Sequence, residues 1–155
     1  MTKSELAQQY FKSGANCAQA VLAAFAEETG LTVEAATRLA SGFGGGIARM
    51  RSVCGTVSGM IMAADAICAS GDMTDKNAKD RQYQLVRSLV DEFVRLNGSY
   101  ICGELLGLAQ AAPEASTVSE TRTPEYFRKR PCVELVGQAA EILEKALAAR
   151  KTSTK

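Results

Sequence analysis

Residues 41–59 constrain the fold more than any other stretch of the chain. Three consecutive glycines, Gly44 to Gly46, disfavour a helix interior, because glycine loses more backbone entropy on ordering than any other residue. A loop with two arginines, Arg49 and Arg51, follows them, and a long apolar run begins at Cys54. The stretch therefore predicts a cationic loop that enters a helix at Cys54, where unpaired N–H groups and the helix dipole favour a thiolate.

The helix predicted over residues 55–70 is expected to be buried. It is apolar almost all round, and Asp65 is its one charge, which is typical of a helix at the centre of a fold. Gly55, Ser58 and Gly59 on its first turns would let another backbone or a cofactor approach closely. Tight packing between helices is an equally good interpretation of these small residues.

Amphipathic spacing and capping residues predict helices along the rest of the chain. The expected helices cover residues 4–11, 16–30, 33–40, 76–96 and 131–150, with further helix starts near Cys102 and at Pro124. Residues 111–123 lack apolar periodicity and are expected to form a loop, and no alternating strand pattern or internal repeat occurs. The chain is therefore predicted to be all-α, with one multi-helix bundle of about six to eight helices over residues 1–150 and a disordered tail at 151–155.

Composition excludes several classes of function. The 155 residues carry 18 basic and 17 acidic side chains, so no global field favours nucleic acid or an anionic membrane surface. Tryptophan is absent, which argues against a base-stacking platform. No apolar run reaches the ~18 residues needed for membrane insertion, and the polar N-terminus lacks the apolar region of a secretory signal. We therefore expect a cytoplasmic protein, in which thiols are normally reduced.

Cysteine is the residue type most suited to carry chemistry here. Histidine is absent, which removes the commonest general base and every imidazole metal ligand. Four of the five cysteines are expected at helix N-termini, where the thiol pKa is lowered: Cys17, Cys54, Cys102 and Cys132. Cys68 lies on the apolar body of its helix and is expected to act as a small hydrophobic residue. The alternative for the four is that they are buried, unreactive cysteines, which helical proteins often contain.

The spacing of the four cysteines excludes the common local motifs. No Cys-x-x-Cys pair occurs, so neither a zinc knuckle nor a thioredoxin-type motif is expected. The glycine loop lacks the Walker spacing and a preceding strand, so a nucleotide site is not expected either. A site built from these cysteines must be assembled by the tertiary fold from separate helices.

The cysteine contexts resemble the C_GCAxxG_C_C family of redox-active four-cysteine proteins over about residues 4–146. Cys17 lies in Gly-Ala-Asn-Cys-Ala-Gln-Ala-Val and resembles the first cysteine of the pattern, and residues 54–59, Cys-Gly-Thr-Val-Ser-Gly, resemble its central motif. Cys102 in Ile-Cys-Gly-Glu-Leu-Leu-Gly and Cys132 in Pro-Cys-Val-Glu resemble the third and fourth. Thr56 departs from the alanine of the motif, and its hydroxyl could add a hydrogen bond near sulfur.

The resemblance implies a redox role without specifying the chemistry. Members of the family are often associated with transporter loci, and the domain is similar to part of split-Soret cytochromes, which also hold an iron–sulfur centre. The chain has no Cys-x-x-Cys-His, so covalent haem attachment is not implied.

Two redox hypotheses and one rival follow. In the first, the thiolates of Cys17, Cys54, Cys102 and Cys132 bind an iron–sulfur cluster for electron transfer, with Gly55, Gly59 and Gly103 close to the cofactor. In the second, pairs of these cysteines cycle between dithiol and disulfide. The rival is a non-catalytic binding or regulatory module for a membrane transporter that uses the long helix 76–96 as its contact surface. Whether the protein is an enzyme, its redox partner and a homodimeric state are left open.

Overall fold

The computed structural model describes residues 1–107 and 116–153, and these residues form an all-α fold, as predicted. They contain nine α-helices and one short 3-10 helix, and their only β-type contact is an isolated antiparallel bridge between Val53 and Ile101. In chain order the helices are α1 (Lys3–Lys12), α2 (Cys17–Ala24), α3 (Ala26–Thr29), α4 (Val33–Leu39), η1 (Ser41–Phe43), α5 (Gly55–Cys68), α6 (Lys76–Asn97), α7 (Cys102–Leu105), α8 (Pro124–Lys129) and α9 (Cys132–Ser153).

The helix boundaries depart from the predicted ones in two places. Residues 16–30, predicted as one helix, form α2 and α3, because Phe25 leaves the helical conformation with φ −104° and ψ 19°. The last helix continues to Ser153 rather than ending near Arg150, and residues 154–155 of the predicted tail lie outside the described residues. Residues 116–123 of the predicted loop contain no helix or strand, and residues 111–115 lie outside the described part of the chain.

Side-chain caps explain where several helices begin. The side chains of Thr2, Thr32, Asp75 and Thr123 each accept a hydrogen bond from the backbone N–H three residues further on. Each such cap is worth about 1 kcal/mol of helix stability, because it satisfies an otherwise unpaired donor. These short-range signals are present in the sequence, which is why the predicted helix starts are close to the observed ones.

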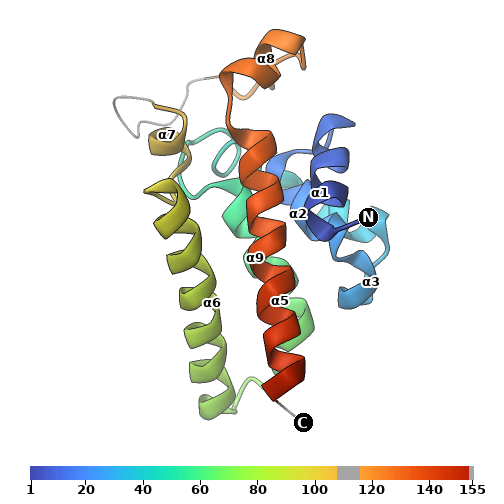
Figure 1. The fold of residues 1–155 in the computed structure, drawn as a ribbon, viewed down its shortest axis with the longest axis vertical. Helices are drawn as coiled ribbons and strands as arrows, with labels where there is room; N and C mark the ends of the chain where they lie inside the picture. Colours follow the sequence, from blue (N-terminus) through green and yellow to red (C-terminus); the bar gives the residue numbers. More distant parts are fainter. Residues whose placement is uncertain (108–115, 154–155) are drawn as a thin grey trace.

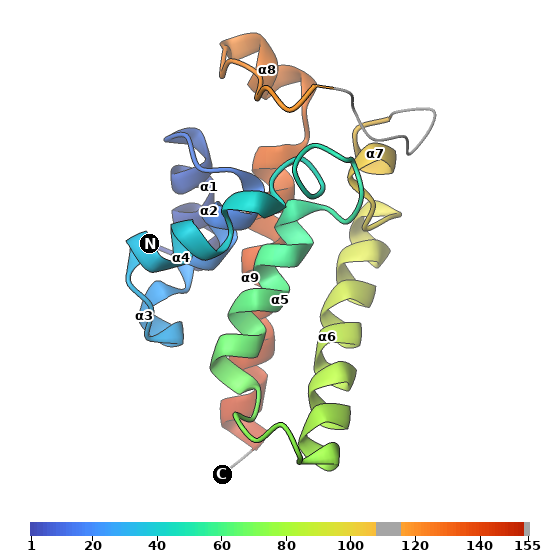
Figure 2. The same ribbon diagram turned by 180° about the vertical axis from the view of Figure 1, so that it is seen from behind.

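The long helices form the body of the molecule, with α9 next to α5, α1 and α2 packed on one side and α6 on the other (Figures 1 and 2). The core is built from apolar side chains of these helices; the largest fully buried ones are Phe11, Leu22, Phe25, Met60 and Phe93. Burying a side chain of this size contributes about 1.5–3 kcal/mol relative to leaving it in water. None of the described helices is both long and apolar enough to cross a bilayer.

The buried residues of helix α5 end at Ala64 and its last turn is partly exposed, which corrects the expectation of a helix buried all round. Gly59 faces α2 so closely that an added Cβ would lie 2.6 Å from the carbonyl oxygen of Ala18. Further along, Asp65 and Ala66 are exposed, and the Asp65 carboxylate accepts a hydrogen bond of 2.8 Å from Gln82 of α6. At the start of α5, the small residue Gly59 therefore lets the backbones of α2 and α5 pack closely together.

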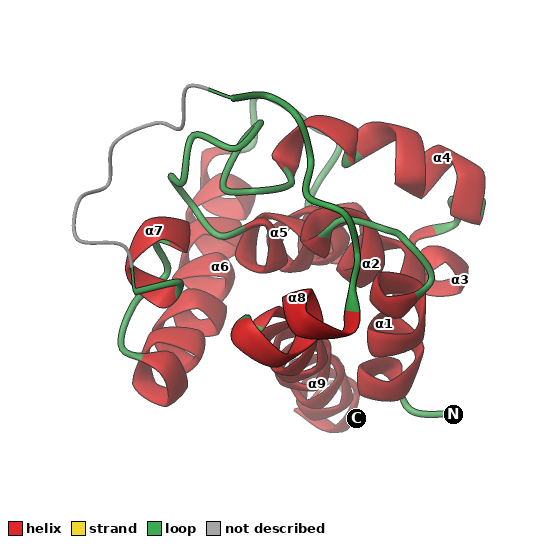
Figure 3. Ribbon diagram, turned by 90° about the horizontal axis from the view of Figure 1, so that it is seen from above, coloured by secondary structure: helices red, strands yellow, loops and turns green. Residues whose placement is uncertain are grey.

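One end of the bundle is covered by irregular chain. In the view from above, the loops lie over the end of α5, α8 lies over the end of α9, and α7 lies next to the end of α6 (Figure 3). The N-termini of α2, α5, α7 and α9 are at this end too, since the cysteines at these four helix starts line one cavity. This arrangement places the four helix starts around the same space.

Candidate thiol site

All four predicted site cysteines meet at one cavity. Cys17, Cys102 and Cys132 are the first residues of α2, α7 and α9, and Cys54 is the residue that caps α5. All four line a cavity of about 270 Å³. The predicted placement at helix N-termini is therefore confirmed for each of them, and the fold brings together residues that are far apart in the sequence.

Cys54 and Cys102 are held next to each other by a short antiparallel contact between segments 51–54 and 100–103. The backbone N–H groups of Cys54 and Cys102 donate to carbonyl oxygens of the opposite segment at 2.8 and 2.7 Å. The N–H of Gly103 donates across the same contact at 3.1 Å. Because these bonds fix both backbones, the two thiols keep a constant relation to the glycine loop.

The glycine loop fits tightly against this pair. Gly46 has a φ of +70°, and a Cβ added there would lie 2.6 Å from the Cβ of Cys102. Four non-glycine residues of the loop also have positive φ: Ile47, Ala48, Arg49 and Arg51. L-residues adopt this left-handed region at a cost, and such strain is concentrated at functional sites.

Cys17 is positioned by the cap of its helix and by the start of α5. Asn16 and Gln19 form a reciprocal capping box at the N-terminus of α2, and Asn16 also donates to the carbonyl of Ser41 at 3.1 Å. Gly55 leaves no room for a side chain, since an added Cβ would lie 2.7 Å from the carbonyl oxygen of Phe43 and 3.3 Å from the Cβ of Cys17. Cys17 therefore lies directly against the first turn of α5.

The four thiols interact around the cavity as a closed set of neighbours. The thiol pairs that influence each other's ionisation are Cys17 with Cys54, Cys54 with Cys102, Cys102 with Cys132, and Cys132 with Cys17. The interaction between Cys17 and Cys132 has the largest effect on the ionisation of either thiol. The four thiols are therefore part of a single four-sulfur site.

Only one of the four thiols has the lowered pKa that their helix positions predict. The interaction with the Cys17 thiol, assisted by the charges of Arg130, Arg122 and Arg51, lowers the pKa of Cys132 to about 7. The same interaction, followed by burial, raises the pKa of Cys17 well above its ordinary value. The pair therefore favours the thiolate at Cys132 and the thiol at Cys17.

The other two thiols also resist ionisation. Burial raises the pKa of Cys54 to about 11 and raises the pKa of Cys102, although Arg51 acts against that increase at Cys102. The expectation of a lowered pKa at all four helix starts was wrong at three positions. Loss of hydration disfavours the charged form more than the helix end favours it when a thiol is this deeply buried.

Thr56 adds a hydroxyl to the site where the family motif has alanine. Its side chain is fully buried, and its Oγ1 atom has no hydrogen-bond partner among the described residues. The hydroxyl acts on the neighbouring sulfurs, because it lowers the pKa of both Cys54 and Cys17 against the larger effect of burial. Within the described residues the structure shows no hydrogen bond from this hydroxyl to a sulfur atom, so the expected bond stays a prediction.

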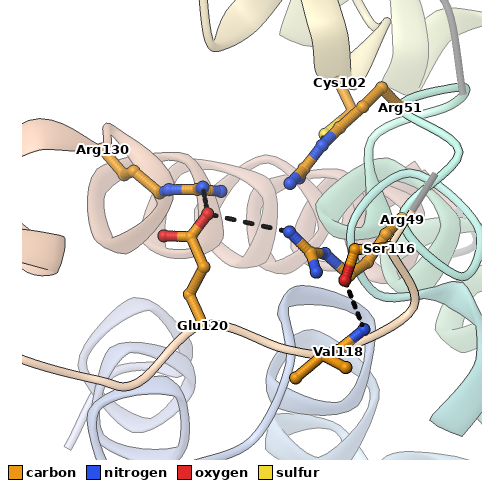
Figure 4. Close-up of polar contacts among 7 residues, drawn as sticks. All are labelled: Arg49, Arg51, Cys102, Ser116, Val118, Glu120 and Arg130. Atoms are coloured by element: carbon orange, nitrogen blue, oxygen red, sulfur yellow. Dashed lines mark hydrogen bonds and ion pairs between the residues drawn. The ribbon is translucent and has the colours of Figure 1, made fainter. Parts of the chain in front are cut away.

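Arginine side chains form much of the cavity wall around the thiols. Arg51 is only 2% exposed, and its Nη1 atom donates to the Sγ atom of Cys102 at 3.8 Å. Figure 4 shows Arg49, Arg51 and Arg130 directed toward one another, with the Glu120 carboxylate paired to both Arg49 and Arg130. Buried guanidinium groups next to thiols favour the thiolate form.

Arg122 fixes the segment 116–123 over the site. Its guanidinium donates to the carbonyl oxygens of Phe11 and Ala15 at 3.3 and 3.1 Å, and it stacks over the rings of Phe11 and Tyr126 at 4.4 and 4.9 Å. Sequence reasoning missed Arg122, Glu120 and Tyr126. The available signal was a charged loop without periodicity, since such loops often carry functional residues.

The remaining predicted residues lie in different surroundings. Gly55 lines the cavity, Gly59 lies in the contact between α2 and α5, and Gly103 is buried beside Arg51. Cys68 is half-buried at the last residue of α5, about 21 Å from Cys54 by the rise per residue of a helix. Cys68 therefore does not share the cavity with the other four cysteines.

The donor set suits sulfur-bound metals, but the side chains are not gathered around a single ion. Within residues 1–107 and 116–153, no three Cys, Asp or Glu side chains converge closely enough to hold one metal ion. Four thiols around one cavity remain a suitable ligand set for a cluster, because a cluster separates its ligand sulfurs more widely than one ion does. Thiol pairs need no such convergence.

These features define an all-α protein with four cysteine thiols and several arginines around one cavity. A family described as "Putative redox-active protein (C_GCAxxG_C_C)" matches residues 15–146, most of the chain. A protein of Archaeoglobus fulgidus described as uncharacterized is 32% identical over 144 residues, which cover 88% of this chain and 87% of that protein. No solved structure matches the chain. The chain belongs to the C_GCAxxG_C_C family of redox-active proteins.

Proposed function

We propose that the protein carries out thiol–disulfide exchange, with Cys132 as the attacking thiolate and Cys17 as the resolving thiol. The observation that carries this proposal is that Cys17 and Cys132, the first residues of α2 and α9, line the same cavity. The lowered pKa of Cys132 supports the same assignment, since a thiolate with a pKa near ambient pH is the most effective attacking group.

The exchange balances within the thiol pair and its substrate. The Cys132 thiolate attacks one sulfur of a substrate disulfide, the S–S bond breaks, and one substrate thiolate leaves. Cys17 then loses its proton and attacks the Cys132 sulfur, which releases the second substrate thiolate and leaves a Cys17–Cys132 disulfide. The protein has lost two electrons and the substrate has gained them. The reverse sequence oxidises a dithiol, and relative reduction potentials decide the direction.

Cys54 and Cys102 would form the second pair of the site. Both thiols favour the protonated form, so they are weak nucleophiles at neutral pH. Cys54 is a neighbour of Cys17 and Cys102 a neighbour of Cys132. We assign them to receiving the disulfide from the first pair, which would let the protein store two more electrons.

An iron–sulfur cluster is the second candidate, and the closed set of four thiols around one cavity favours it. Cys17, Cys54, Cys102 and Cys132 would be the ligands, and a bound cluster would supply one-electron transfer. The buried Arg51 at Cys102 would offset part of the negative charge of such a group. Gly55, at the start of α5, lines the cavity in which the cluster would lie.

The two candidates are separated by purifying the protein without oxygen and measuring iron, sulfide and visible absorbance before any oxidant is added. The metal-free, reduced protein is then treated with the neutral compound 2-hydroxyethyl disulfide, and the disulfides formed are located by peptide mass spectrometry. We expect a Cys17–Cys132 disulfide. In Cys17→Ser, Cys132 should instead accumulate as a mixed disulfide, and Cys68→Ala should behave as the unchanged protein.

Other outcomes contradict the exchange proposal. Stoichiometric iron and sulfide with loss of thiol reactivity would favour the cluster, and Cys54→Ser should then abolish its binding. Uniformly slow reaction of every cysteine without bound metal would favour the binding module, with the exposed side of α6 as its contact surface. A disulfide that joins only Cys54 and Cys102 would reverse the roles of the two pairs.

A further inference from the structure

The cavity wall next to Cys132 is strongly cationic. In the described part of the wall, Arg49, Arg51, Arg122 and Arg130 come from the glycine loop and from residues 116–130, and Glu120 is the one carboxylate. Arg49 and Arg130 share that carboxylate. Two guanidinium groups therefore divide a single negative charge between them.

The two hydrogen bonds that hold the Arg122 side chain in the cavity wall do not involve a carboxylate. Its two hydrogen bonds go to neutral backbone carbonyls, of Phe11 and Ala15, and its flat face rests on Phe11 and Tyr126. Arg130 also lies over Tyr126, at 5.0 Å. Both charges are thereby fixed in orientation at the cavity, and both act on the Cys132 thiol.

We propose that this cavity binds low-molecular-weight disulfides that carry carboxylates, and that Arg122 and Arg130 hold the carboxylates while Cys132 reacts with the disulfide. The inference rests on the thiol–disulfide function proposed above and names its substrate class. A guanidinium suits a carboxylate because its planar set of N–H donors can form two parallel hydrogen bonds. Cationic walls of low dielectric also concentrate anions and speed their association.

The size and depth of the cavity favour a small substrate over a protein. Cys132 is 8% exposed, and it opens into a space of about 270 Å³, close to the lower end of the range of small-molecule pockets. A disulfide within a folded protein cannot reach a sulfur at this depth unless its own chain is extended. A flexible disulfide of the size of a short peptide can.

The reaction with such a substrate is balanced by the protein's own thiols. One molecule of the disulfide takes two electrons from Cys132 and Cys17 and leaves as two free thiols, and the protein keeps a Cys17–Cys132 disulfide. A single turnover therefore needs no further reductant. Repeated turnover needs a dithiol that reduces the protein again, and that dithiol is the co-reactant of the cycle.

The test compares three disulfides of different charge on the reduced full-length chain: oxidised glutathione, which carries carboxylates, neutral 2-hydroxyethyl disulfide and cationic cystamine. Single-turnover oxidation of Cys132 is followed by acid quench, alkylation and mass spectrometry. The rate of Cys132 oxidation by each disulfide is divided by the rate at which the same disulfide oxidises Cys132 in the protein unfolded in urea. This ratio removes differences in intrinsic reactivity between the three disulfides. We expect oxidised glutathione to exceed the neutral compound by about tenfold, with cystamine slowest, and the preference to shrink as salt is added.

Substitutions in the wall test the assignment of the two arginines. Arg122→Gln and Arg130→Gln should each reduce the glutathione preference by about three- to tenfold, whereas Glu120→Gln, which removes the carboxylate, should increase it. Arg81→Gln is the matched control, since it removes the same charge from an exposed position in the first turns of α6. If Arg122→Gln does not fold, Arg130→Gln, Glu120→Gln and the charge series on the unchanged protein still decide the question.

The outcomes separate this inference from the function on which it rests. Equal normalised rates for all three disulfides, or a preference that Arg130→Gln and Glu120→Gln leave unchanged, would overturn the carboxylate site while a Cys17–Cys132 disulfide still formed. Failure of every disulfide to oxidise Cys132 would overturn both proposals.

Discussion

Replacing Gly46 by alanine tests how the glycine loop supports the thiol site. The added Cβ would lie 2.6 Å from the Cβ of Cys102, 2.7 Å from the backbone nitrogen of Ser52 and 2.8 Å from the Cα of Arg51. None of these atoms can rotate away, because two belong to the backbone and the third is bonded to it. The substitution must therefore displace the loop or the segment that carries Cys102.

The expected cost has two parts, and Gly30 separates them. Gly46 has a φ of +70° and Gly30 a φ of +75°, so alanine is strained to a similar extent at both positions, by about 1–2 kcal/mol. Nothing lies within 4 Å of the Cβ position at Gly30, whereas overpacking at Gly46 adds about 1–3 kcal/mol. Gly46→Ala should therefore lower the free energy of unfolding by about 2–5 kcal/mol in total, and Gly30→Ala by about 1–2 kcal/mol.

Urea unfolding followed by far-UV circular dichroism measures both costs. We expect a larger fall in the urea midpoint for Gly46→Ala than for Gly30→Ala, with the slope of free energy against urea unchanged in both. In the native proteins, alkylation of Cys102 should become faster only in Gly46→Ala, because its surroundings are opened. Equal midpoint shifts for the two variants, together with unchanged alkylation of Cys102, would refute the argument that the loop packs against this cysteine.

Three further predictions follow from the environments of the thiols. Alkylation of Cys132 by iodoacetamide should rise with pH with a midpoint at its pKa of about 7, because only the thiolate reacts; a rate that is flat between pH 6 and pH 8 would contradict this. Burial raises the pKa of Cys54 in the folded protein to about 11, against an ordinary value of 9.0. The contribution of this thiol to the free energy of unfolding is therefore fully present below pH 9 and is lost as the pH rises toward 11. At 1.36 kcal/mol per pKa unit, the loss is about 2–3 kcal/mol. The urea stability of the unchanged protein should therefore fall more steeply over that range than the stability of Cys54→Ser, and parallel profiles would show that the thiol is not protected from ionisation. Thr56→Val should raise the pKa of Cys54 and slow the alkylation of Cys54 at a fixed pH, since the hydroxyl that lowers this pKa is removed. Thr56→Ser keeps a hydroxyl and should have a smaller effect. Equal alkylation rates in the valine and serine variants would exclude a role for the hydroxyl.

Local signals made most of the fold predictable. Thr32 and Asp75 cap helices that begin where the sequence indicates, and the spacing of apolar residues located the long helices to within a few residues. The break at Phe25 was missed because the apolar pattern continues through it, and the residue leaves the helix while its side chain stays in the core. A pattern of hydrophobicity records which residues are buried and does not record a local change of backbone direction.

The placement of the four cysteines at helix starts was also a local property. Asn16 before Cys17 and Pro131 before Cys132 are short-range signals for a helix start, and each cysteine lies where those signals put it. The family resemblance rests on the same contexts. Neither signal contains the distances between the helices, so the sequence could name the four residues without showing which of them are neighbours around the cavity.

By itself, the sequence determined an all-α chain and singled out Cys17, Cys54, Cys102 and Cys132 as the candidate site residues, because helix propensity, capping and the absence of histidine are properties of neighbouring residues and of composition. Only the tertiary structure decided that Cys132 has the lowered pKa and that Arg122 lies in the same wall. The physical reason is that hydration, the interaction between distant thiols and the charges around them depend on how helices pack. At Cys54 and Cys102 burial outweighs the dipole that the sequence alone reveals, and at Cys17 the interaction with Cys132 and then burial do so.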